Sequence, residues 1–211
     1  MSSECQIQFK TKWWFDNGRG SAESPRVIWE RELPPRFPNG LDLYLEIGVC
    51  EGHSMRWVLE NLSPRLAIGI DPYIPKKRDL AEESATHKRN MSENLRSWIE
   101  SRQCLIYCEK SQDLLKASPP VVDDLSCDLI YVDGDHNALP ALTDMVLAWP
   151  KVKVGGIMIL DDYNKRWQLG RPHAKEAIDC FLDAAESRYD WEWGPTRKIW
   201  CCQVAVRKIK A

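Results

Sequence analysis

Four aspartates stand at the ends of two apolar runs in the second half of the chain. Asp133 and Asp135 follow the first run, and Asp161 and Asp162 follow the second. If both runs are parallel strands, the four carboxylates gather at one edge of a sheet. Carboxylates that lie a few ångströms apart repel one another, and each raises the pKa of its neighbours. The cluster therefore predicts a bound cation, a cationic ligand or a carboxyl group that stays protonated.

A glycine turn in the first half of the chain is the second candidate for chemistry. Gly48 and Gly52 follow an apolar run and precede a predicted helix, a spacing that lets a ligand approach the backbone closely. Asp71 ends the next run, where a carboxylate can accept both hydroxyls of a ribose. Each feature alone is typical of an ordinary turn or cap, but at successive strand ends they favour a nucleoside. A dinucleotide fingerprint would need a glycine in place of Cys50, which weighs against nicotinamide.

The elements that must position these residues alternate along the chain between short apolar runs and helical spacing. We expect strands at 41–48, 66–71, 104–108, 128–133 and 154–161. We expect helices at 54–61, 93–102, 113–117, 139–149 and 174–187. A closing antiparallel hairpin is expected at 190–197 and 200–209. The pattern predicts a doubly wound α/β fold, with a mostly parallel seven-stranded sheet and helices on both faces.

The first forty residues differ from the rest. Trp13, Trp14 and several prolines predict an irregular arm with one short helix at 27–31. The aromatic side chains suit a lid over a ring-shaped acceptor, and they are equally suited to covering a sheet edge or pairing two copies in a homo-oligomer. We therefore divide the chain into an arm or lid at 1–40 and one α/β domain at 41–211.

Composition narrows the class of protein. The chain has 211 residues, 44% of them hydrophobic, and a net charge of −2 without a basic stripe, so we expect no nucleic-acid partner. It has no apolar run of membrane-spanning length and no signal-peptide pattern at its start, so we expect a cytoplasmic protein without a membrane partner. The eight cysteines include no Cys-x-x-Cys pair, which argues against structural zinc.

Several motifs resemble a known family. Glu46-x-Gly48-x-x-x-Gly52, Asp71 and Gly155-Gly156 are similar to motifs of class I S-adenosylmethionine-dependent methyltransferases, which have a Rossmann-like fold. Three later motifs resemble the bacterial sugar and antibiotic O-methyltransferases, the macrocin O-methyltransferase-like group: Asp133-Gly134-Asp135-His136, Asp161-Asp162-Tyr163 and Ala174-x-x-Ala177-Ile178-Asp179-x-Phe181. The segment Lys110-Ser111-Gln112-Asp113-Leu114-Leu115 is similar to the adenine-contacting turn of catechol-type O-methyltransferases. The resemblance covers about residues 41–182.

The resemblance implies S-adenosylmethionine as cofactor and a hydroxyl of a sugar-containing or phenolic small molecule as acceptor. The implied cofactor contacts are Glu46, Gly48, Gly52, His53, Ser54, Asp71, Ser111, Gln112 and Asp133. It also implies a divalent metal held by Asp133, Asp161 and Asp162, and an all-oxygen set favours Mg²⁺. Either Asp135 or His136 would be the base, with Asp135 slightly favoured.

Residues beside this site would meet the acceptor. These are Tyr163, Asn164, Trp167, Trp13 and Trp14, together with expected loops at 73–90 and 164–172. Three alternatives stay open: a metal-independent methyltransferase, a non-catalytic nucleotide-binding module and a hydride-transferring enzyme. The carboxylate cluster argues against the binding module, since a nucleotide alone gives it no role.

Overall fold

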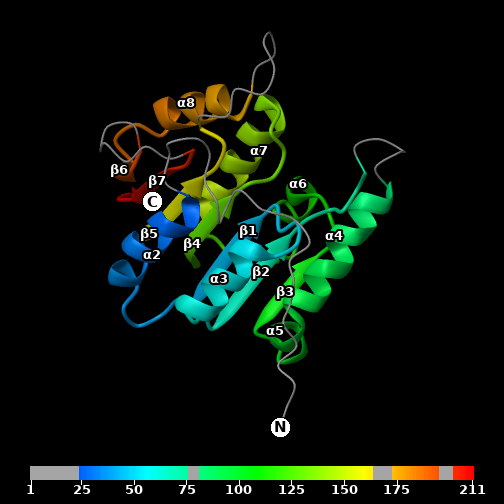
Figure 1. Ribbon diagram of the computed structural model, residues 1–211. Coiled ribbons are helices and arrows are strands. Elements are labelled where there is room, and N and C mark those ends of the chain that lie inside the picture. Colours follow the sequence, from blue (N-terminus) through cyan, green and yellow to red (C-terminus); the bar gives the residue numbers. More distant parts are fainter. Residues whose placement is uncertain (1–23, 76–80, 164–172, 195–201) are drawn as a thin grey trace.

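One seven-stranded sheet forms the centre of the protein (Figure 1). The computed structural model describes residues 24–75, 81–163, 173–194 and 202–211. The strands are β1 (Leu43–Ile47), β2 (Leu66–Ile70), β3 (Cys104–Tyr107), β4 (Cys127–Val132), β5 (Val152–Leu160), β6 (Tyr189–Trp193) and β7 (Val204–Lys208). Their order is β3-β2-β1-β4-β5-β7-β6. The first five strands pair in parallel and β7 pairs antiparallel with both β5 and β6, so the predicted fold, including the closing hairpin, is confirmed.

Helices cover both faces of the sheet. Four of them, α2 (Pro25–Glu32), α3 (His53–Asn61), α4 (Ala81–Asn94) and α5 (Arg96–Glu100), contribute to one apolar layer. The other layer lies under α6 (Ser111–Leu114), α7 (Ala138–Ala148) and α8 (Ala174–Ala184). Two short 3-10 helices, Pro34–Arg36 and Trp149–Lys151, complete the described elements. Successive strand residues point to opposite faces, so each buried strand supplies both layers, which explains why the strands lack polar alternation.

The strand order reverses between β1 and β4, and this position determines where a ligand can bind. Residue Ile47 of β1 lies beside Val132 of β4, and Val132 in turn lies beside Leu160 of β5. The backbone continues this pairing beyond the strands, since the Asp133 amide donates to the carbonyl of Ile47 at 2.8 Å and the Asp161 amide to that of Val132 at 3.1 Å. The acidic residues predicted to gather at one sheet edge therefore do so.

The described part of the predicted arm packs against the sheet. Helix α2 begins at Pro25 after Ser24, whose hydroxyl accepts from the Val27 amide at 3.3 Å as an N-cap. Its side chains Ile28 and Trp29 are fully buried in the layer shared with α3. Residues 1–23 lie outside the described residues, so the lid role stays a prediction.

The segment between β2 and β3 differs from the loop that we expected at 73–90. Helix α4 covers Ala81–Asn94, and α5 takes the place of the helix expected at 93–102. Only Met91 and Asn94 of α4 are buried, so its sequence lacks the apolar periodicity that predicts helices. No helix in the described ranges is long and apolar enough to cross a membrane.

We predict that Ile28→Ala lowers the free energy of unfolding by about 2–5 kcal/mol, because it leaves a cavity beneath α2. The neighbouring Val27, 46% exposed, provides the matched control: Val27→Ala should change stability little. Chemical denaturation measures both variants. Equal, small losses would mean that α2 is not part of the cooperative core.

Candidate active site

The glycine turn between β1 and α3 lies against the end of β4. Gly48 has φ +93°, and a Cβ atom there would stand 1.9 Å from the backbone oxygen of Asp133. Only glycine fits so close an approach. Gly52, with φ +82°, is the N-cap of α3, and among the described residues no side chain caps that end. The first amides of α3 therefore resemble the anion sites found at helix N-termini.

Glu46 is fully buried on β1 beneath this turn. Its carboxyl group accepts hydrogen bonds from the Tyr44 hydroxyl at 2.7 Å and from the Ser54 hydroxyl at 2.5 Å. Burial raises the pKa of Glu46 to about 8, and the charges of Asp133 and Asp71 act in the same direction, against the two hydrogen bonds. Glu46 is therefore largely protonated at neutral pH.

Asp71 supports the same turn from the end of β2. Its carboxylate accepts from the amides of Cys50 and Tyr73, each at 2.9 Å, and the Tyr73 hydroxyl donates to the Cys50 carbonyl at 2.9 Å. Each carboxylate oxygen can accept a second hydrogen bond, so a ribose can still bind there. Helix α4 also supports this turn, because the amide side chains of Asn90 and Asn94 donate to the carboxylate and the carbonyl of Glu51, both at 2.9 Å.

The predicted adenine residues, Ser111 and Gln112, lie on the first turn of α6. The Ser111 hydroxyl donates to Asp144 of α7 at 2.6 Å. Burial raises the pKa of Asp144 to about 6. We did not identify Asp144 from the sequence; the available signal was an acid on the apolar side of a predicted helix.

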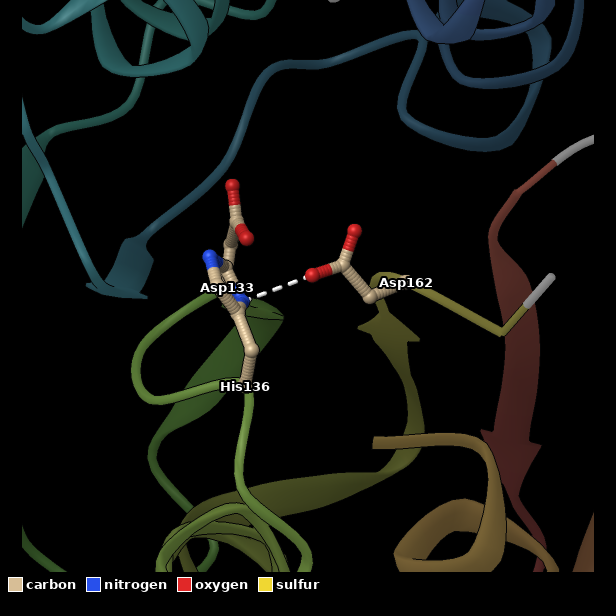
Figure 2. A group of neighbouring side chains, drawn as sticks. All are labelled: Asp133, His136 and Asp162. Carbon is tan, nitrogen blue, oxygen red and sulfur yellow. Dashed lines mark ion pairs between the residues drawn. The ribbon is translucent and has the colours of Figure 1, made fainter. Parts of the chain in front are cut away.

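Three side chains converge beyond β4 and β5 (Figure 2). Asp133, His136 and Asp162 each offer one ligand atom, and these three atoms lie within 4.8 Å of one another. His136 Nδ1 pairs with Asp162 Oδ2 at 2.6 Å. Asp162 is only 5% exposed, whereas His136 is 44% exposed. Two carboxylates and an imidazole at this spacing can hold a divalent cation.

Asp161 is not among the three side chains that meet at this distance, although the sequence predicted it as a ligand. It is 4% exposed, and neither of its carboxylate oxygens accepts a hydrogen bond from a donor group in the described part of the chain. Burial, followed by the charges of Asp133 and Asp162, raises its pKa well above the ordinary value. A buried carboxyl group in this state is stabilised by a proton or by a cation.

The remaining polar candidates within the described residues are Asp135, Tyr163 and His53. Asp135 accepts from the Asn137 amide at 2.8 Å and from the Asn137 side chain at 2.6 Å, just before α7 begins. Tyr163 donates to Asp179 of α8 at 2.9 Å. His53 is the first residue of α3. The other acceptor candidates, Asn164, Trp167, Trp13 and Trp14, lie outside the described residues.

Comparison with known proteins identifies the family of the chain. Residues 45–163 match the family model described as a methyltransferase domain, which is more than half of the chain. The chain belongs to this methyltransferase domain family. It is also 30% identical over 127 residues to an uncharacterized protein, R132, of Acanthamoeba polyphaga mimivirus, covering 59% of this chain and 53% of the relative. The chain thus spans about half the length of that curated relative.

Solved structures share the fold of this methyltransferase domain. Cofactor-bound Rv0187 from MTB has a TM-score of 0.62 at 16% identity, with 90% of this chain and 83% of that chain covered. The O-methyltransferase TomG from Streptomyces achromogenes, in complex with SAM, has a TM-score of 0.59 at 16% identity, with 90% of this chain and 82% of that chain covered. The N-methyltransferase NodS from Bradyrhizobium japonicum WM9, in complex with S-adenosyl-L-homocysteine, has a TM-score of 0.57 at 16% identity, with 97% of this chain and 95% of that chain covered.

We predict a pH dependence of stability that arises from Glu46. Its pKa rises from 4.5 in the unfolded chain to about 8 in the folded protein, so the folded state holds the proton more tightly. The stability that this provides is complete below the lower value and is lost as the pH rises through the higher one. Between them, this group should lower the free energy of unfolding by up to about 1.4 kcal/mol per pH unit.

Denaturation of the ligand-free protein from pH 5 to 9, with a chelator present, measures this slope. Glu46→Gln, which mimics the protonated acid, should make the profile flatter. Glu100→Gln, at an exposed position of α5, should keep the wild-type profile. An unchanged slope in the Glu46 variant would show that this carboxyl group titrates normally.

Proposed function

We propose that this methyltransferase domain transfers the methyl group of S-adenosylmethionine to a hydroxyl oxygen of a small sugar-containing or phenolic acceptor, with a divalent cation in the acid cluster. The observation that carries the proposal is the convergence of Asp133, His136 and Asp162 next to the glycine turn. The likeness to TomG supports oxygen as the acceptor atom. The identity of the acceptor atom needs a test, because NodS has a related fold and is an N-methyltransferase.

The cofactor would lie along the carboxyl ends of β1 and β2. The turn at Gly48 and Gly52 would receive its methionine part beside the uncapped start of α3. Asp71 would hold the ribose, because its two oxygens are already aligned by backbone amides. Ser111 would meet the adenine edge, with its hydroxyl fixed by Asp144.

The residues of the acid cluster fit a divalent cation. Asp133 and Asp162 would hold it, and Asp161 would add a third carboxylate. Within the described ranges, no donor group gives a hydrogen bond to the Asp161 oxygens. Carboxylate oxygens suit Mg²⁺ or Mn²⁺. When bound, such an ion orients an acceptor hydroxyl and lowers its pKa.

His136 is our choice of base. Its Nδ1 donates to Asp162, which makes Nε2 the ring nitrogen that carries the lone pair. Nε2 would take the proton of the acceptor hydroxyl as the oxygen bonds to the methyl carbon. In the same step the carbon–sulfur bond would break, and its electron pair would stay on sulfur to give S-adenosylhomocysteine. Asp135 is less suited than we expected from the sequence, because one of its oxygens already accepts two hydrogen bonds from Asn137, the residue before α7.

One observation favours a second candidate function, a metal-independent methyltransferase. The pair of His136 and Asp162, at 2.6 Å, is the arrangement of a base and the acid that orients it, and it can work without an ion. Calorimetric titration separates the two candidates. S-adenosylmethionine and then Mg²⁺ or Mn²⁺ are titrated into metal-free protein. Saturable binding of both supports the proposal, binding of the cofactor alone supports the metal-independent enzyme, and binding of neither rejects both.

We predict that Asp161→Asn weakens ion binding by more than about tenfold, because it removes an anionic ligand. The same change should leave the melting temperature of the metal-free protein unchanged or higher, since it removes a buried carboxyl group with a raised pKa. Calorimetry and thermal denaturation measure the two effects. Asp190→Asn, at an exposed position of β6, is the control. Ion affinity equal to that of the control would remove Asp161 from the metal site.

We predict that Asp71→Ala weakens S-adenosylmethionine binding by about 1.5–3 kcal/mol, the loss expected for hydrogen bonds to a charged group. Asp128 allows a matched control, because its carboxylate also accepts from two backbone amides, those of Asp42 and Leu43, at the opposite end of the sheet. Asp128→Ala should therefore lower the free energy of unfolding without weakening the binding of S-adenosylmethionine. Equal cofactor affinity in the two variants would refute the ribose role.

A further inference from the structure

A chain of buried hydrogen bonds runs from the N-terminal helix α2 to the acid cluster. The indole Nε1 of Trp29 donates to Gln203 Oε1 at 2.9 Å. The Gln203 Nε2 donates to the Tyr131 hydroxyl at 3.0 Å, and that hydroxyl donates to Asp133 Oδ2 at 3.2 Å. The three donors come from α2, from the residue before β7 and from β4. They join segments that are up to 174 residues apart in the sequence.

The chemistry of the donors sets the direction of this chain. An indole N–H can only donate, so Trp29 requires the oxygen of the Gln203 amide to face it. The amide nitrogen must then face Tyr131 and donate to it. The Tyr131 hydroxyl accepts that bond, so its own proton is left for Asp133. Each group thus determines the orientation of the next, and the chain ends with a donor that points at a carboxylate.

Burial makes this orientation hard to replace. Trp29 and Gln203 are fully buried and Tyr131 is 1% exposed, so water does not offer alternative partners. Trp29 and Tyr131 belong to the apolar layer beneath α2 and α3.

We propose that Trp29, Gln203 and Tyr131 are positioning residues that orient the Asp133 carboxylate for a divalent cation, and that they couple the packing of α2 to the affinity of the metal site. By donating to Oδ2 at 3.2 Å, Tyr131 would restrict the rotation of the Asp133 carboxylate beside the ion. The inference rests on the proposed function, because it assumes that Asp133 is a ligand. It adds a role for a helix that lies outside the residues matched by the family model.

The test compares two buried tryptophans. Trp57 packs edge-to-face on Trp29 with ring centroids 5.6 Å apart, but its indole nitrogen has no hydrogen-bond partner among the described residues. Trp29→Phe and Trp57→Phe therefore remove similar volumes from the same layer, and only the first breaks the chain. Tyr131→Phe removes the last link and leaves the ring in place. Mg²⁺ and Mn²⁺ are titrated by calorimetry into each metal-free protein that carries S-adenosylmethionine.

We expect Trp29→Phe and Tyr131→Phe to weaken ion binding about tenfold, the scale for partners that orient a metal ligand. Trp57→Phe should stay within about twofold of the wild type. The inference is overturned if the ion affinity of Trp29→Phe equals that of Trp57→Phe, since packing alone would then explain both. A wild type that binds the cofactor but no ion would overturn the metal part of the proposed function and this inference with it.

A second measurement covers the case in which Tyr131→Phe fails to fold. The indole N–H resonance of Trp29, assigned by its loss in Trp29→Phe, should shift when Mg²⁺ is added to the wild type, because the chain connects it to Asp133. The indole resonance of Trp57 should shift less. If the wild type binds the ion by calorimetry but the Trp29 resonance does not move, the coupling between α2 and the site is refuted.

Discussion

The crowding of buried carboxyl groups where β1, β4 and β5 end is the constraint on which the site depends. Charges of one sign in a low-dielectric interior repel strongly, so each must be neutralised or hydrogen-bonded. Glu46 retains a proton, and the hydroxyls of Tyr44 and Ser54 donate to it. Asp162 pairs with His136. Asp161 differs from these, because no donor group within the described ranges gives a hydrogen bond to its oxygens. It also lies close to the charges of Asp133 and Asp162. A cation, or a proton shared with Asp133, would remove this imbalance.

Backbone and side chains are also packed closely around these carboxyl groups. The turn at Gly48 approaches Asp133 so closely that only glycine fits, and this brings the predicted cofactor loop against the first acid of the cluster. The adjacent Glu51 is buried and bonded to α4 through Asn90 and Asn94. The cofactor loop is therefore supported from β2, β4 and α4 together. A ligand that binds it meets a surface that is already ordered, which lowers the entropic cost of binding.

The sequence predicted the sheet and the acids at its edge because both depend on local patterns. Apolar runs that end in acids identify Asp133, Asp161 and Asp162 wherever the strands are parallel. The polar helix α4 was missed because only Met91 and Asn94 of its residues are buried, and periodicity cannot detect such a helix. The bond between Trp29 and Gln203 was missed for a different reason: it joins residues 174 positions apart, and no local pattern connects them. Such contacts appear only once the topology has placed β7 between β5 and β6.

The choice between the two candidate bases illustrates what geometry adds to residue type. In the sequence, Asp135 and His136 are adjacent and both can take a proton. In the structure their surroundings differ, because Asp135 holds the backbone and side chain of Asn137 at the start of α7, whereas His136 pairs with the buried Asp162. A carboxylate oxygen that already accepts two hydrogen bonds loses that stabilisation when it is protonated. An imidazole whose Nδ1 donates to an acid gains from protonation of its other nitrogen, since the resulting cation is paired. The cost of taking up a proton is therefore lower at His136, and this difference arises from the partners of the two residues.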